Sequence, residues 1–254
     1  METTPTQPRD AAQRSTFWED VHTGHDVDGV SWWQSVPELS LGLVAATGIG
    51  PDRPVIDVGA GWSTLVDHLL ERGYQDLTAI DLSTTALQVV RDRLGPAGNT
   101  VALEMADVLD LHPTRRYALW HDRAVYHFLT EPDEREDYLA SLERSLEPGG
   151  HAVVATFGPD GPTTCSGLPI VRYTHAALVA QFPTYELLGT AGDDHQTPWG
   201  STPAVHRHSP PPTGVTPVTA TWTPAGTNRR RHHGRTLAGD SPEIAPHENP
   251  TRTR

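Results

Sequence analysis

Apolar residues follow two alternating periods between residues 54 and 157. Short runs that are apolar throughout have the length of buried strands, and the stretches between them carry apolar residues three or four positions apart, as amphipathic helices do. Strands that alternate with helices predict βαβ units and a parallel sheet. The predicted strands are Val55–Val58, Leu77–Ile80, Val101–Met105, Tyr117–Trp120 and Ala152–Phe157, and the predicted helices are at about Thr64–Arg72, Thr84–Leu94 and Glu134–Leu146.

The same pattern continues on both sides of this region. A helix is predicted from Pro37 to about Gly48, and a helix at about Tyr173–Gln181 and a strand at about Tyr185–Thr190 follow the fifth strand. Residues 1–16 are polar and predict a flexible N-terminus. Residues 17–202 therefore predict one α/β domain with a mostly parallel sheet and helices on both faces.

Residues 203–254 have a different composition. They are rich in Pro, Thr, His and Arg, and they contain seven Arg against three acidic residues, whereas residues 1–202 contain 12 Arg against 29 acidic residues. Such a segment cannot bury enough apolar surface to offset its chain entropy, so it predicts a disordered tail without the last strand of the sheet. One explanation is a native solvated tail. The other is a shift of the reading frame near Pro203, since GC-rich DNA encodes these residue types when it is read out of frame.

The charge and the cysteine content narrow the function classes. The formal net charge is −13 and every basic residue is Arg. An acidic surface argues against nucleic acid as a partner. The chain has no leader-like or membrane-length apolar stretch, so we expect a cytoplasmic protein without membrane contact. The single Cys165 excludes an internal disulfide and a zinc site with several thiolates, and no metal is predicted. The oligomeric state is left open.

A glycine-rich turn follows the first predicted strand. Asp57, Gly59 and Gly61 stand at its end, where glycine allows positive φ and a close approach of the backbone to a ligand. A dinucleotide-binding domain begins in a similar way, but Thr64 replaces the small residue that such a domain has at the sixth position of its glycine pattern.

Two further acids follow the next two strands. Asp81 ends the second strand, 22 residues after Gly59, and is followed by Leu82. Two carboxylate oxygens at this place can accept hydrogen bonds from both hydroxyls of a ribose. Asp107 and Val108 follow the third strand, where a carboxylate and a backbone N–H suit an adenine.

These segments, together with the helix stop at Glu147–Gly150, resemble the class I S-adenosylmethionine-dependent methyltransferases over roughly residues 50–190. The resemblance implies a Rossmann-like methyltransferase sheet of seven strands and S-adenosyl-L-methionine as the cofactor. It places the cofactor-binding residues at the methionine, ribose and adenine ends and in an N-terminal lid. They are Asp57, Gly59 and Gly61 (methionine), Asp81 and Leu82 (ribose), Asp107 and Val108 (adenine), and Trp33 beside Trp32 (lid). For the two tryptophans, a role in packing alone is the alternative.

The candidate catalytic residues follow the fourth strand. Methyl transfer is an in-line displacement, so the protein mainly aligns the nucleophile and takes its proton where there is one. His121 and Asp122 are candidates for the base and Arg123 for binding a substrate anion. A strand-end histidine and a helix cap with a salt bridge are the structural alternatives. His127 is expected to be a core or helix-face histidine.

A short segment favours a small-molecule substrate. Trp120, Asp122, Arg123 and Ala124 are similar to a Trp-Asp-Arg-Gly segment of the thiopurine methyltransferases, with His121 as an extra residue. We therefore expect methyl transfer to a small-molecule nucleophile. A protein lysine methyltransferase and an inactive frame-shifted remnant are the alternatives.

Overall fold

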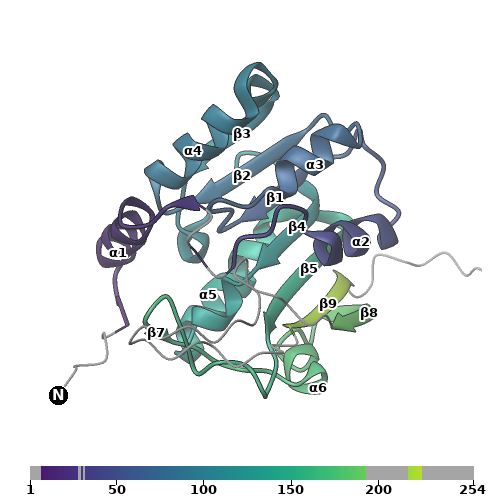
Figure 1. The fold of residues 1–254 in the computed structure, drawn as a ribbon. Coiled ribbons are helices and arrows are strands. Elements are labelled where there is room, and N and C mark those ends of the chain that lie inside the picture. Colours follow the sequence, from purple (N-terminus) through teal and green to yellow (C-terminus); the bar gives the residue numbers. More distant parts are fainter. Residues whose placement is uncertain (1–6, 28–29, 31, 193–216, 225–254) are drawn as a thin grey trace, which may run out of the picture.

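The computed structural model describes residues 7–27, 30, 32–192 and 217–224. Its centre is a seven-stranded sheet with the order β3-β2-β1-β4-β5-β9-β8 (Figure 1). β9 is antiparallel to both of its neighbours and every other adjacent pair is parallel, which confirms the mostly parallel sheet. The strands of this sheet are β1 (Val55–Val58), β2 (Leu77–Asp81), β3 (Val101–Met105), β4 (Tyr117–Arg123), β5 (Leu146–Phe157), β8 (Tyr185–Gly192) and β9 (Pro217–Pro224).

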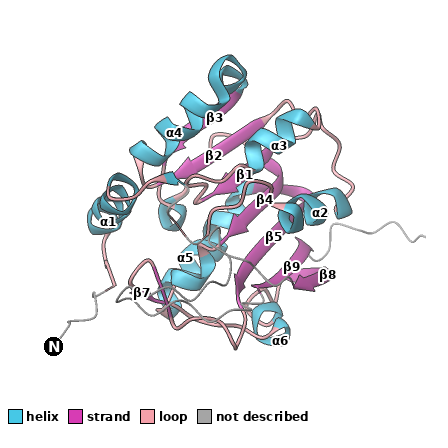
Figure 2. Cartoon of the chain, in the orientation of Figure 1, coloured by secondary structure: helices cyan, strands magenta, loops and turns pink. Residues whose placement is uncertain are grey.

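Helices cover both faces of the sheet (Figure 2). No helix in the described part of the chain is both long and apolar enough to cross a membrane. A small two-stranded hairpin, β6 (Thr164–Cys165) and β7 (Leu168–Pro169), stands apart from the sheet. The helices are α1 (Ala11–Thr23), α2 (Glu38–Ala46), α3 (Leu65–Glu71), α4 (Thr84–Leu94), α5 (Pro132–Ser145) and α6 (His175–Val179).

The alternation of side chains along β1 divides the core between the two faces. Ile56 and Val58 belong to the cluster that packs under α5 and α6, with Leu142 of α5 fully buried in it. Val55 belongs to the cluster under α2, α3 and α4, together with Leu65 of α3. Asp57 alternates with Val58 and so points to the same face as Val55, towards α2.

The N-terminus differs from its prediction. α1 begins at Ala11, inside the segment 1–16 for which the sequence predicts flexibility, because Asp10 caps the helix by accepting a hydrogen bond from the backbone N–H of Gln13 at 2.8 Å. Residues 1–6 lie outside the described residues.

The C-terminal segment also departs from its prediction. The sequence predicts disorder from residue 203 and no last strand, but β9 lies at Pro217–Pro224 and pairs with β5 and β8. The prediction is therefore wrong for these eight residues. Residues 193–216 and 225–254 lie outside the described residues.

His127 is a core residue, as expected, but its imidazole forms no hydrogen bond with any residue that the structure describes. It is 0% exposed and neither ring nitrogen has a partner among the described residues. Its ring lies between Phe128 and Phe157, with centroids at 4.3 and 4.9 Å. Burial lowers the pKa of the imidazole from 6.5 to about 3, because charge is costly in such surroundings.

We expect His127 to make the protein less stable in mild acid. Below about pH 6.5 the imidazole takes up a proton in the unfolded chain but not in the folded chain, which favours unfolding. The free energy of unfolding is therefore at its full value above pH 6.5 and falls as the pH falls towards 3. At ~1.36 kcal/mol per pKa unit, the free energy of unfolding should fall by about 2 kcal/mol between pH 7 and pH 5. Urea unfolding of the wild type and of His127→Leu at both pH values measures this. An equal loss in both proteins would contradict it.

Candidate active site

The turn after β1 brings backbone close to the carboxyl end of the sheet. Gly59 and Gly61 have φ of +60° and +50°. A Cβ on Gly59 would lie 2.1 Å from Cγ2 of Val125, so no larger residue fits there. The glycine turn therefore has the positive φ angles that the sequence predicts, and it leaves its backbone open to a ligand.

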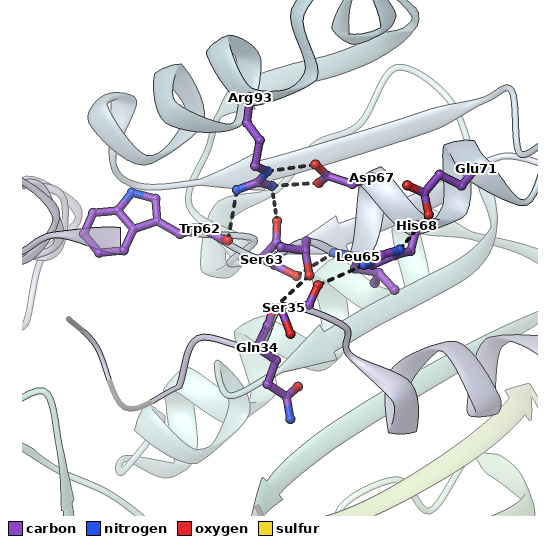
Figure 3. A network of polar contacts seen from close by, with 10 residues as sticks. Gln34, Ser35, Trp62, Ser63, Leu65, Asp67, His68, Glu71 and Arg93 are labelled. Atoms are coloured by element: carbon purple, nitrogen blue, oxygen red, sulfur yellow. Dashed lines mark hydrogen bonds and ion pairs between the residues drawn. The ribbon is translucent and has the colours of Figure 1, made fainter. Parts of the chain in front are cut away.

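Arg93 of α4 fixes the far side of this turn (Figure 3). Its guanidinium donates to the backbone carbonyls of Trp62 and Ser63 at 3.2 and 2.6 Å and to both oxygens of Asp67 at 2.8 and 2.7 Å. The hydroxyl of Thr64 donates to the carbonyl of Gln34 at 3.0 Å. The turn is thus tied to α4 on one side and to the segment before α2 on the other.

Asp81 lies at the end of β2 and faces the glycine turn. Its two oxygens accept hydrogen bonds from the backbone N–H groups of Gly61 and Ser83, both at 2.8 Å. Burial raises the pKa of this carboxyl, and nearby His22 and the backbone N–H groups of Ser83, Gly61 and Leu82 oppose the rise. Each oxygen keeps a further lone pair for a ligand hydroxyl.

Asp107 has a partner that the sequence did not indicate. Oδ2 accepts two hydrogen bonds from the guanidinium of Arg14 in α1, at 3.0 and 2.7 Å, and Oδ1 accepts one from the backbone N–H of Leu109 at 3.0 Å. The remaining lone pair of Oδ1 is free to accept from a ligand amino group.

α1 forms a cover over this edge of the sheet. Besides Arg14, the hydroxyl of Ser15 donates to the carbonyl of Leu82 at 3.1 Å, and the indole of Trp18 packs edge-on against Phe128 at 5.0 Å. The polar N-terminal sequence has no periodic pattern of apolar residues from which this helix could be predicted. α1, which the sequence did not predict, therefore covers this edge of the sheet.

A pocket opens between α1, the glycine turn and the ends of the strands. Arg14, Trp18 and His22, which sequence reasoning missed, contribute to its wall. Seven of the eight predicted cofactor residues line it: Asp57, Gly59, Gly61, Asp81, Leu82, Asp107 and Val108.

The eighth predicted cofactor residue, Trp33, does not line the pocket; its neighbour Trp32 does. Both tryptophans pack against a small cluster around Val30 and Trp62. Trp32 thus contacts the pocket as well as this cluster, whereas Trp33 belongs to the packing of the cluster.

The three candidate catalytic residues are also divided. Arg123 lines the pocket, and its guanidinium donates to the side-chain oxygen of Gln34 and, at 3.3 Å, to the carbonyl of Trp32. His121 and Asp122 are 1% and 0% exposed, and neither lines the pocket. A base must reach the proton that it takes, so the structure gives no support to these two as bases.

Asp122 has a structural role in its place. Its carboxylate accepts hydrogen bonds from the backbone N–H groups of Val125 and Tyr126 at 2.8 and 3.1 Å and from the hydroxyl of Tyr138 at 2.7 Å. Burial raises the pKa of Asp122 to about 6, which these three donors oppose. The side chain caps the turn that follows β4, which is the structural role that the sequence left open for it. It forms no salt bridge with any described residue.

We expect Asp122→Ala to destabilise the fold by about 3 kcal/mol, because it leaves three buried donors without an acceptor. Tyr138→Phe removes the hydrogen bond to Asp122 and also leaves the buried indole N–H of Trp120 without its acceptor at 2.9 Å, so it should cost about 2 kcal/mol. Urea unfolding of the two variants measures both values. An Asp122→Ala protein with wild-type stability would contradict this structural role.

No group of three or more His, Cys, Asp or Glu side chains in the described part of the chain is arranged to hold a metal ion. Cys165 lies in the β6–β7 hairpin and lines the pocket, and burial raises the pKa of its thiol to about 11. At neutral pH this residue is therefore a protonated thiol.

Comparison with known proteins agrees with this geometry. Residues 55–150 match the family model of a methyltransferase domain. EEF1A lysine methyltransferase 2 of Mus musculus is 27% identical over 114 residues, which is 41% of this chain and 46% of that protein. The aligned part is thus less than half of that relative's length.

Two solved structures have the same fold. One, from work on the conversion of a disulfide bond into a thioacetal group during echinomycin biosynthesis, has a TM-score of 0.65 at 22% identity and covers 83% of this chain and 92% of that one. The 1,6-didemethyltoxoflavin-N1-methyltransferase of Burkholderia thailandensis has a TM-score of 0.62 at 21% identity, covering 88% and 93%. Residues 55–150 therefore form a methyltransferase domain, in a chain with the fold of the class I S-adenosylmethionine-dependent methyltransferases.

Proposed function

We propose that this protein transfers a methyl group from S-adenosylmethionine to a small-molecule nucleophile. The observation that carries the proposal is the convergence of Asp57, Asp81 and Asp107 with the glycine turn on one pocket. These groups come from three separate strand ends, and together they offer acceptors of the kind that an amino group, ribose hydroxyls and an adenine amino group would need.

The residues present suit the cofactor in their chemistry. Oδ2 of Asp57 is buried and has no hydrogen-bond partner among the described residues, which a ligand ammonium would provide. The glycine turn gives the ligand access to backbone where a Cβ would collide with Val125. We therefore assign Asp57, Gly59 and Gly61 to the methionine end, Asp81 and Leu82 to the ribose, and Asp107 and Val108 to the adenine.

The bound cofactor supplies the electrophilic methyl group, and the protein holds the acceptor in line with it and excludes water. The pocket has an apolar part that suits the body of a small molecule, with Arg123 as its half-buried cation. Its apolar lining residues are Trp18, Trp32, Val125, Phe128, Leu129, Phe157 and Leu168. The thiol of Cys165, with its raised pKa, does not take a proton at neutral pH.

Titration calorimetry with S-adenosylmethionine tests the cofactor site. We expect Asp81→Ala to raise Kd by at least about tenfold, because two ribose hydroxyls lose their acceptors. Asp76→Ala is the matched control, since Asp76 precedes the same strand and pairs with Arg115 on the surface. Equal affinities of Asp81→Ala and the wild type would contradict the site, and weaker binding by the control would assign the loss to β2 as a whole.

A protein lysine methyltransferase is the second candidate, favoured by the similarity to EEF1A lysine methyltransferase 2. Mass spectrometry separates the two functions. The enzyme and S-adenosylmethionine are incubated with a panel of small amines, thiols and nitrogen heterocycles, and in parallel with purified elongation factor 1A. We expect methylated products from the panel alone; methyl-lysine in the elongation factor, with none from the panel, would favour the second candidate.

A further inference from the structure

Three buried polar side chains form a chain behind the glycine turn. His121 of β4 lies directly opposite Asp57 of β1 in the parallel register. Its Nδ1 is 2.6 Å from Oδ1 of Asp57, and its Nε2 is 2.9 Å from the hydroxyl oxygen of Ser40 in α2. All three residues are at most 4% exposed. The chain thus connects a helix on one face of the sheet to the carboxylate that lines the pocket.

This arrangement leaves the carboxylate of Asp57 with two unlike oxygens. Oδ1 is engaged by the imidazole, whereas Oδ2 has no partner among the residues that the structure describes. A buried carboxylate without hydrogen bonds is costly, so His121 stabilises the charge that Asp57 carries. It also fixes the rotation of the carboxylate and so the direction in which the free oxygen points.

The hydrogen positions follow from the partners. An ionised carboxylate only accepts hydrogen bonds, so Nδ1 of His121 carries the hydrogen in this contact. The hydroxyl of Ser40 accepts or donates, and so it pairs with Nε2 in either state of the ring. The imidazole is therefore held from both sides in a single orientation.

We propose that His121 is a positioning residue that orients the carboxylate of Asp57 towards the amino group at the amino-acid end of the cofactor. The inference rests on the proposed function and adds to it a residue that touches no ligand. Because His121 does not line the pocket, it acts through Asp57 alone. Its loss should therefore affect ligands that have the amino-acid arm and spare those that lack it.

Two ligands and two matched variants test this. S-adenosylhomocysteine has the amino-acid arm, and 5′-methylthioadenosine has the same nucleoside without it. His121→Leu removes the donor, whereas His121→Asn, of similar size, keeps an amide N–H near the position of Nδ1. By calorimetry we expect His121→Leu to weaken S-adenosylhomocysteine by roughly 10- to 100-fold, the usual effect of losing a hydrogen bond to a buried charge. Its affinity for 5′-methylthioadenosine should be unchanged, and His121→Asn should retain most of the wild-type affinity for both ligands.

His127→Leu is the control for removal of a buried histidine, since His127 is equally buried and has no contact with Asp57 among those described. It should bind both ligands as the wild type does. If His121→Leu does not fold, Ser40→Ala decides, because it removes only the far end of the chain and should weaken S-adenosylhomocysteine selectively by a few fold.

The outcomes separate the two proposals. In the first outcome the wild type binds both ligands, and the decisive variant either binds them equally well or loses the same affinity for both. This would overturn the positioning role and leave the proposed function standing. A folded wild-type protein that binds neither ligand would refute the proposed function, and this inference with it.

Discussion

The cost of burying carboxylates at one edge of the sheet governs the architecture of this site. Asp57, Asp81 and Asp122 are all at most 7% exposed, at the carboxyl ends of β1, β2 and β4. Each would be unstable there without donors. Asp122 has three donors from its own turn and α5, and Asp81 has two backbone N–H groups with His22 nearby. Among the described residues, Asp57 has one donor, His121, and its second oxygen has no partner.

The carboxylates themselves could be predicted from the sequence, but several of their hydrogen-bond partners could not. The strand runs and the acids that end them could be predicted, because a buried strand, a glycine turn and a helix follow one another within a few residues of chain. The register of β1 and β4 then decides that His121 faces Asp57 across 64 residues. Arg14 reaches Asp107 across 93 residues. Such pairings depend on tertiary packing, and no local pattern near His121 or Arg14 encodes them.

In β9 the sequence does contain a local strand pattern, but the overall composition of the segment led to a prediction of disorder. Val218, Ala220 and Trp222 alternate with threonines, which is the period of a strand. The run stands between prolines in a segment poor in aliphatic residues, so composition predicted disorder. The sheet supplies what the segment lacks by itself, namely hydrogen-bonding partners on both sides, in β5 and β8.

The position of β9 also sets an order of events during synthesis. β8 is made before β9, but in the described sheet its hydrogen-bonded neighbour is β9, and β9 alone lies between it and β5. On the ribosome, the parallel sheet from β3 to β5 can assemble while one edge of β5 still lacks its partner. The nascent chain must expose that edge until residue 224 has emerged, some 30 residues after the end of β8. Translation past this point closes the sheet, so a chain released earlier would retain an open strand edge able to pair with other chains.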